Sequence, residues 1–181
     1  MKSRFNISLL FALAAALAYV PWLLVTVPWL GRSLGQGLFA VSATAAYLAL
    51  TAPRPALRLH AAILTAAGGG VLWLLMPGDA ARWLSLAVVM AAVRSVILYR
   101  RRSPARALAV DATLLLGGLL AAKALAGPTL LGGALAVWGF LLVQSLFFLI
   151  TDVETRGESS DGDPFEEAHL RATRLLEQTG V

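Results

Sequence analysis

Residues 6–29 read NISLLFALAAALAYVPWLLVTVPW, a stretch of 24 residues without a charged side chain. About 20 consecutive apolar residues are enough for a helix to cross the hydrocarbon core of a bilayer. Lipid offers the backbone no hydrogen-bond partner, so a helix is the ordinary form of such a segment. The stretch therefore predicts a membrane-spanning helix, which Pro21 can kink because proline lacks a backbone donor.

The first four residues, Met1-Lys2-Ser3-Arg4, and the apolar run behind them resemble the start of a secretory signal peptide. A small-residue cleavage site can be placed at Ala14-Ala15-Ala16. The apolar run continues to Leu30, however, which is longer than the hydrophobic region of a signal peptide. We therefore expect this first span to be retained in the protein.

Five more apolar stretches follow, each bounded by charged residues, prolines or glycines. We place them at 35–52, 57–76, 83–99, 107–126 and 129–151. The composition agrees, because 59% of the residues are hydrophobic, 14% are charged and the mean hydropathy is +0.76. Soluble domains are about half apolar and about a quarter charged. We expect an all-α, polytopic membrane protein in which residues 1–151 form a bundle of six transmembrane helices.

Basic residues gather on alternate connections between these stretches. One set consists of Lys2, Arg4, Arg54, Arg58, Arg100, Arg101, Arg102 and Arg106. The opposite connections hold fewer, namely Arg32, Arg82 and Lys123, together with Asp79. Cytoplasmic loops of membrane proteins are enriched in Lys and Arg. We therefore expect both termini in the cytoplasm and the protein in the plasma (inner) membrane.

The chain changes character after Thr151. Residues 1–151 carry twelve Lys or Arg and two acids, whereas residues 152–181 carry three and eight. We expect an acidic flexible linker over 152–162 and a short cytoplasmic amphipathic helix over 163–181. The apolar stripe of this helix consists of Phe165, Ala168, Ala172, Leu175 and Leu176. A helix this short is marginal alone, so the segment either docks on a partner protein or is a frayed, solubilising tail.

Arg94 and Asp111 are charged residues inside the expected spans. Arg94 lies six residues before Arg100 and Asp111 five residues after Arg106, which places both about 8–9 Å from the same boundary. We therefore expect an ion pair between the fourth and fifth spans. It either fixes the register of these helices, with Arg94 reaching toward phosphates, or lines a path for a substrate or proton.

Lys123 is the third candidate in this group, because it lies near the outer end of the fifth span. A lysine at such a position ordinarily extends its amine toward the interface. The alternative is a gate or a contact for an anion.

The sequence offers no residue set for enzymatic chemistry. It contains no cysteine and no GxGxxG or GxxxxGK[ST] phosphate-binding motif. His60 stands beside Arg58 without a second histidine or a carboxylate, and His169 belongs to the tail. We therefore expect a protein that is not an enzyme and has no metal site, cofactor or nucleic-acid partner. The net charge of +5 reflects the basic loops.

Few polar residues lie within the spans, whereas small residues are abundant there. This balance favours an accessory, scaffold or assembly subunit of a membrane complex, whose tail helix docks on a membrane or cytoplasmic protein subunit. The alternative is a transporter of a small solute or ion, or its membrane substrate-binding subunit, that uses the Arg94–Asp111 pair. The lipid bilayer is a partner in either case.

Overall fold

The computed structural model describes residues 2–98 and 104–160, and every regular element within them is helical. The elements are α1 (Lys2–Thr51), α2 (Pro55–Leu75), α3 (Asp79–Ala92), the π-helical segment η1 (Val93–Leu98), α4 (Pro104–Leu125) and α5 (Leu130–Ser160). The chain divides into two compact units, Met1–Phe147 and Phe148–Val181. The packing described below is that of the first unit.

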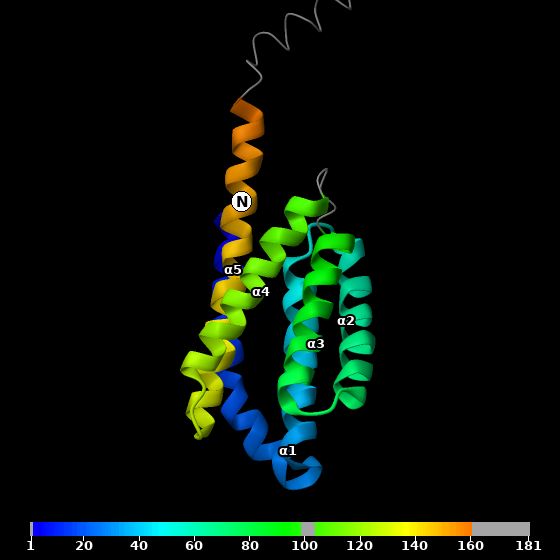
Figure 1. The fold of residues 1–181 in the computed structure, drawn as a ribbon, viewed down its shortest axis with the longest axis vertical. Coiled ribbons are helices and arrows are strands. Elements are labelled where there is room, and N and C mark those ends of the chain that lie inside the picture. The colour runs from blue at the N-terminus through cyan, green and yellow to red at the C-terminus, as the bar shows by residue number, and fades with distance from the viewer. Residues whose placement is uncertain (1, 99–103, 161–181) are drawn as a thin grey trace, which may run out of the picture. The chain divides into compact units, whose positions relative to one another are not determined.

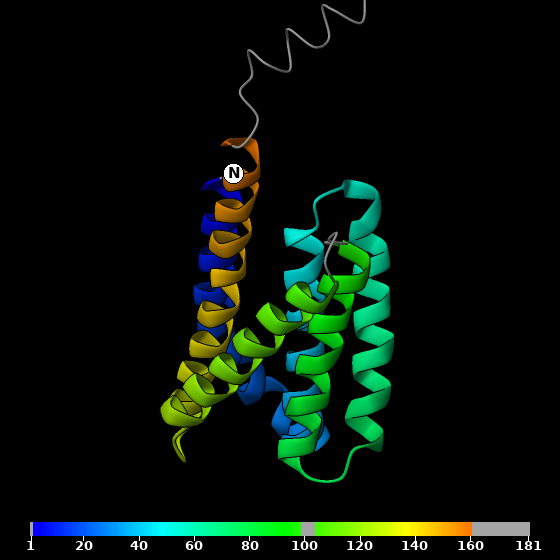
Figure 2. The same ribbon diagram turned by 45° about the horizontal axis from the view of Figure 1, so that its top comes forward.

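Helix α1 folds back on itself at Gly31, where φ is 76° and ψ is 165°. This backbone conformation is essentially restricted to glycine. Figures 1 and 2 show the chain turning round at this point. Ser8 Oγ donates to the Tyr47 hydroxyl at 3.0 Å, and Gln36 Nε2 donates to the Tyr19 hydroxyl at 3.1 Å. Because the partners run in opposite order along the chain, the two arms of α1 are antiparallel.

The stretches expected as the first two spans, 6–29 and 35–52, fall on these two arms. Three helical segments in the described part of the chain are long and apolar enough to cross a membrane. They are Arg4–Thr51, which contains both arms, Pro55–Leu75 and Leu130–Ile150. The structure thus supports an all-helical protein with membrane-compatible helices, whereas the number of six spans stays a prediction.

The stretch 83–99, expected as the fourth span, is not an α-helix throughout. Helix α3 begins at Asp79 and ends at Ala92, and the chain continues as the π-helical segment Val93–Leu98. A π turn contains more residues than an α turn and is rare in proteins. Hydropathy does not reveal it, because the segment is equally apolar in either geometry.

Three connections lie at one end of the first unit, namely the Gly31 turn, the α2–α3 connection and the α4–α5 connection (Figures 1 and 2). Arg82 joins the first two, because its Nη1 donates to Ser33 Oγ at 2.8 Å and its Nε to the Met76 carbonyl at 3.1 Å. The α1–α2 connection, which carries Arg54, lies at the opposite end (Figure 1). The loop charges likewise assign these connections to opposite sides.

Small residues allow the helices to approach closely. A Cβ at Gly69 in α2 would lie 2.8 Å from Leu86 Cδ1 in α3, and one at Gly118 in α4 would lie 3.0 Å from the Phe140 ring in α5. Helix α2 runs through residues 68–70 without a break. Of the three consecutive glycines at 68–70, Gly69 is therefore the one where α2 packs closely on α3.

The outward-facing side chains are strongly apolar. Leu10, Trp29, Leu74, Leu75 and Val96 each expose between 66% and 86% of their surface. Exposure of many apolar side chains is unfavourable in water, so their distribution over several helices suits a lipid environment.

Helix α5 extends to Ser160, so most of the segment 152–162, which we expected to be a flexible linker, is helical. Extension of an existing helix gains one hydrogen bond per added residue, without the cost of a new nucleus. The expected tail helix over 163–181, with Phe165, Ala168, Ala172, Leu175 and Leu176, lies outside the described residues.

Candidate functional site: a buried ion pair beside an apolar cavity

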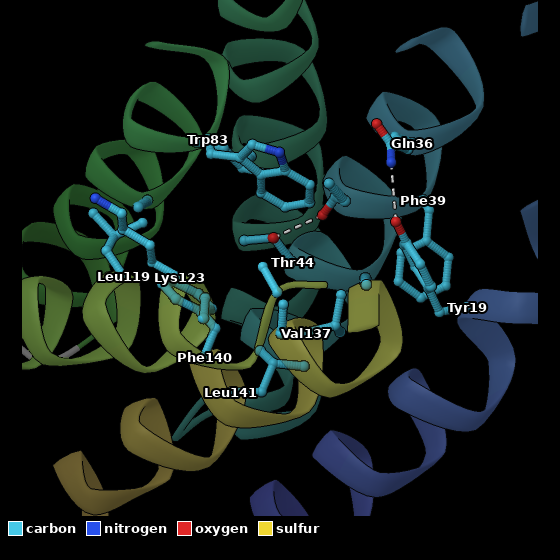
Figure 3. A pocket seen from close by; sticks show the side chains of 18 of the residues that line it. Tyr19, Gln36, Phe39, Thr44, Trp83, Leu119, Lys123, Val137, Phe140 and Leu141 are labelled. Carbon is cyan, nitrogen blue, oxygen red and sulfur yellow. Dashed lines mark hydrogen bonds between the residues drawn. The ribbon is translucent and has the colours of Figure 1, made fainter. Parts of the chain in front are cut away.

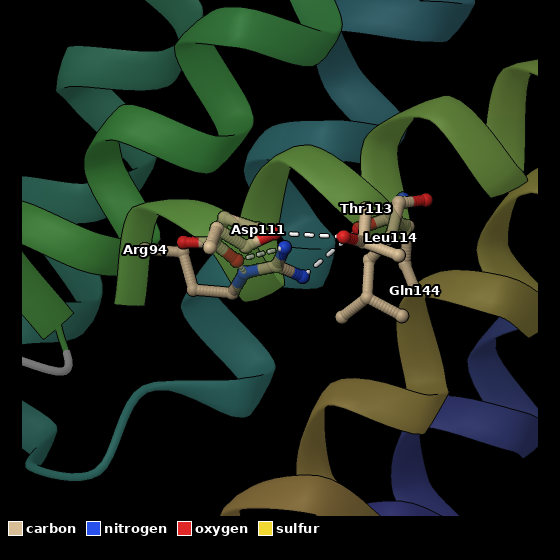
Figure 4. A network of polar contacts seen from close by, with 6 residues as sticks. Arg94, Asp111, Thr113, Leu114 and Gln144 are labelled. Atoms are coloured by element: carbon tan, nitrogen blue, oxygen red, sulfur yellow. Dashed lines mark hydrogen bonds and ion pairs between the residues drawn. The ribbon is translucent and has the colours of Figure 1, made fainter. Parts of the chain in front are cut away.

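Arg94 in η1 and Asp111 in α4 form the ion pair that their matched depth predicts (Figure 4). Arg94 Nε donates to Asp111 Oδ1 at 2.9 Å, and Nη2 donates to the same oxygen. The side chains are 1% and 2% exposed. A buried charge is tolerated only when a partner compensates its lost hydration.

Helix α5 completes the surroundings of Arg94. Arg94 Nη1 donates to Gln144 Oε1 at 2.9 Å, so all three guanidinium nitrogens are hydrogen-bonded. Gln144 Nε2 donates in turn to the Leu114 carbonyl at 2.9 Å. The guanidinium carbon lies 4.3 Å from the centre of the Phe147 ring, a cation–π distance. The network therefore joins η1, α4 and α5.

Arg94 lies on the π-helical segment. Such segments appear frequently at functional sites, where the extra residue changes the direction of neighbouring side chains. An irregular turn that carries a fully buried charge is therefore a candidate functional position.

A cavity of about 510 Å³ lies between α1, α3, α4 and α5. Figure 3 shows side chains from these helices converging on it. Most of its lining is apolar, with the larger side chains contributed by Phe39, Trp83, Leu86, Met90, Phe140 and Leu141. Cavities of this size and polarity are typical of sites for small organic ligands.

Polar side chains are few in the lining. Thr44 Oγ1 donates to the Ala40 carbonyl at 2.7 Å, and the Tyr19 hydroxyl accepts the hydrogen bond from Gln36 (Figure 3). Tyr19 is only 3% exposed. Arg32 and Lys123 also line the cavity and are exposed, which places both at its rim.

The cavity and the ion-pair network are neighbours. Met90 lines the cavity four residues before Arg94, and Leu141 lines it three residues before Gln144. At about 1.5 Å per residue, these steps correspond to about 5–6 Å along the helices. Arg94 and Gln144 therefore lie about one helical turn from lining residues on their own helices, whereas Asp111 lies eight residues, or about 12 Å, before the lining residue Leu119 on α4.

The structure separates Lys123 from the other two candidate residues. Lys123 lies twelve residues after Asp111 on the continuous helix α4, or about 18 Å along its axis. Lys123 thus belongs to the rim of the cavity, whereas Arg94 and Asp111 belong to the network.

Gln144 and Phe147 were not among the candidate residues from the sequence. Gln144 could have been identified from its polarity within an apolar stretch, but no sequence signal marked Phe147. Within residues 2–98 and 104–160, no group of three or more His, Asp or Glu side chains could hold a metal ion. His60 is exposed, with Nδ1 3.0 Å from the Ala56 carbonyl oxygen.

No family model, curated protein sequence or solved structure matches this chain. The cavity and the neighbouring network are therefore the basis for assigning a function. Both are built entirely from residues of the first unit.

Proposed function

We propose that this protein is a non-enzymatic, multi-pass membrane protein that binds a small apolar or amphiphilic solute. It acts as a solute transporter or as the membrane substrate-binding subunit of one. The observation that carries the proposal is the apolar cavity of about 510 Å³, whose lining residue Met90 lies about one helical turn from Arg94 of the buried Arg94–Asp111 pair. Charged residues inside membrane domains commonly mark substrate or ion pathways.

In this proposal the network closes one end of the cavity. Its residues come from three elements, so a relative movement of α4 or α5 would break hydrogen bonds to Arg94. An element with a closed and an open arrangement is what alternating access requires. The exposed rim with Arg32 and Lys123 is the opposite, open end.

The proposal includes a topology of six spans in the plasma membrane, with both termini in the cytoplasm. The bias of the loop charges supports it. The grouping of the Gly31, α2–α3 and α4–α5 connections at one end of the first unit supports it as well. The cavity rim then faces outward and the network lies toward the cytoplasm.

This topology predicts opposite labelling of two pairs of positions. The chain has no cysteine, so single cysteines can be introduced without further changes. In intact cells a membrane-impermeant maleimide should label Arg32→Cys and Asp79→Cys but not Arg54→Cys or Arg58→Cys. Permeabilised cells should give labelling at all four positions. The reverse pattern, or equal labelling of both pairs in intact cells, would contradict the topology.

The binding function predicts a bound compound that depends on free space in the cavity. Ala136 lines the cavity, so Ala136→Trp should fill part of it and abolish binding. Protein purified from native membranes should yield an enriched small molecule by mass spectrometry, and this variant should not. The matched control is Ala67→Trp, because Ala67 is exposed on α2 and is not part of the lining.

Retention of the compound by a folded Ala136→Trp variant would show that it binds elsewhere. A stoichiometric protein partner without any small molecule would instead favour an accessory or assembly subunit. The amphipathic stripe in residues 163–181 is the sequence feature that supports this second role.

A further inference from the structure

The charged residues that line the cavity are all basic. Arg32 in the second arm of α1 and Lys123 in α4 line it, and its described lining contains no Asp or Glu. Both basic residues are exposed, so they stand at the rim rather than in the apolar interior. The site is therefore polarised, with positive charge at its mouth and an apolar wall behind it.

The interior would favour an alkyl chain over a polar solute. Phe39, Trp83, Met90, Phe140 and Leu141 supply most of its large side chains. The hydrogen-bonding groups of Thr44 and Gln36 are engaged, at least in part, with other groups of the protein. A polar solute would lose its hydrogen bonds to water on entering this cavity and would form few new ones with the lining, which is unfavourable.

We propose that the cavity binds a single-chain amphiphile with an anionic head, such as a long-chain carboxylate. The chain occupies the space between α1, α3, α4 and α5, and the head lies at the rim with Arg32 and Lys123. This assignment rests on the proposed binding function and specifies its ligand class. A volume of about 510 Å³ suits one small ligand rather than a two-chain lipid.

Charge complementarity provides the selectivity. A ligand drawn from the bilayer leaves one apolar environment for another, so burial of its chain discriminates little between amphiphiles. The head stays at the exposed rim and keeps part of its hydration, which avoids the large cost of a buried charge. An attraction to two cations then favours an anionic head over a neutral or cationic one.

The test is a binding measurement on the full chain in nanodiscs of neutral phosphatidylcholine. Scintillation proximity with radiolabelled palmitate reports binding, and empty nanodiscs give the background. We expect saturable binding that excess palmitate displaces at about tenfold lower concentration than hexadecanol, and that hexadecylamine does not displace. A tenfold ratio is about 1.4 kcal/mol, within reach of two exposed charge contacts.

Charge variants locate the site. Lys123→Gln and Arg32→Gln should each weaken palmitate binding about threefold, as expected for loss of one of two exposed charge contacts that together contribute about tenfold. Arg58→Gln is the matched control, because Arg58 is exposed and lies outside the lining. It should leave the Kd unchanged. Ala136→Trp should remove the saturable component.

Equal displacement by hexadecanol, with no effect of the two rim variants, would overturn the anionic ligand class and leave the proposed binding function intact. Absence of saturable palmitate binding would overturn the ligand class too. In that case the binding function would still be supported by a different compound that copurifies with the wild-type protein and is absent from purified Ala136→Trp. If lysophosphatidic acid displaces radiolabelled palmitate as strongly as unlabelled palmitate does, the result would support a site for an anionic head that is either a phosphate or a carboxylate.

Discussion

Replacement of Arg94 by leucine should lower the free energy of unfolding by about 3–5 kcal/mol, and Asp111→Leu should do the same. Each change leaves the other charge buried without its ion-pair partner, and the two side chains are 1% and 2% exposed. The double variant Arg94→Leu/Asp111→Leu removes both charges and should recover most of the loss. Thermal unfolding in detergent and the yield of monodisperse protein measure the effect.

Two controls separate the ion pair from ordinary packing. Gln144→Leu keeps the pair but removes an acceptor from Arg94 and a donor from the Leu114 carbonyl, so its loss should be smaller, about 1–3 kcal/mol. Arg58→Leu changes an exposed arginine and should have little effect on stability. Additive losses in the double variant would show that the pair does not stabilise the fold as a unit.

The folded double variant also separates a structural role from a functional one. If the network closes the cavity, the double variant should fold but lose transport or retention of the bound compound. If the pair only fixes the register of α4 against η1, both stability and binding should return together.

Gly132→Ala should destabilise the protein by about 1–3 kcal/mol or more, because its Cβ would overlap the backbone of the α4–α5 connection. It would clash with the Gly127 nitrogen and lie 2.6 Å from Gly127 Cα. Backbone atoms cannot move aside as the end of a flexible side chain can, so the connection itself has to shift. Thermal unfolding in detergent measures the loss.

The matched control for this variant is Gly70→Ala in α2. A Cβ at Gly70 has nothing within 4 Å, and alanine is the better helix former by about 1 kcal/mol. Gly70→Ala should therefore be neutral or slightly stabilising. A Gly132→Ala protein as stable as wild type would contradict the close approach between Gly127 and Gly132.

The sequence by itself determined the class of structure and the approximate position of its helices. Apolar stretches of sufficient length can satisfy their backbone in lipid only as helices, so all-helical structure followed from hydropathy. Matched distances from the basic loops also predicted the contact between Arg94 and Asp111, because helix rise converts residue number into depth. Local hydropathy was less informative at residues 152–160, where a continuing helix replaced the expected linker.

Only the tertiary structure decided what surrounds these residues. The π-helical turn at 93–98, the contacts of Arg94 with Gln144 and Phe147, and the separation of Lys123 from the pair depend on how helices distant in the sequence pack. The cavity has the same origin, since its wall combines α1, α3, α4 and α5. Hydropathy records how apolar a segment is, but the space left between helices depends on the fit of their side chains, which no single segment encodes.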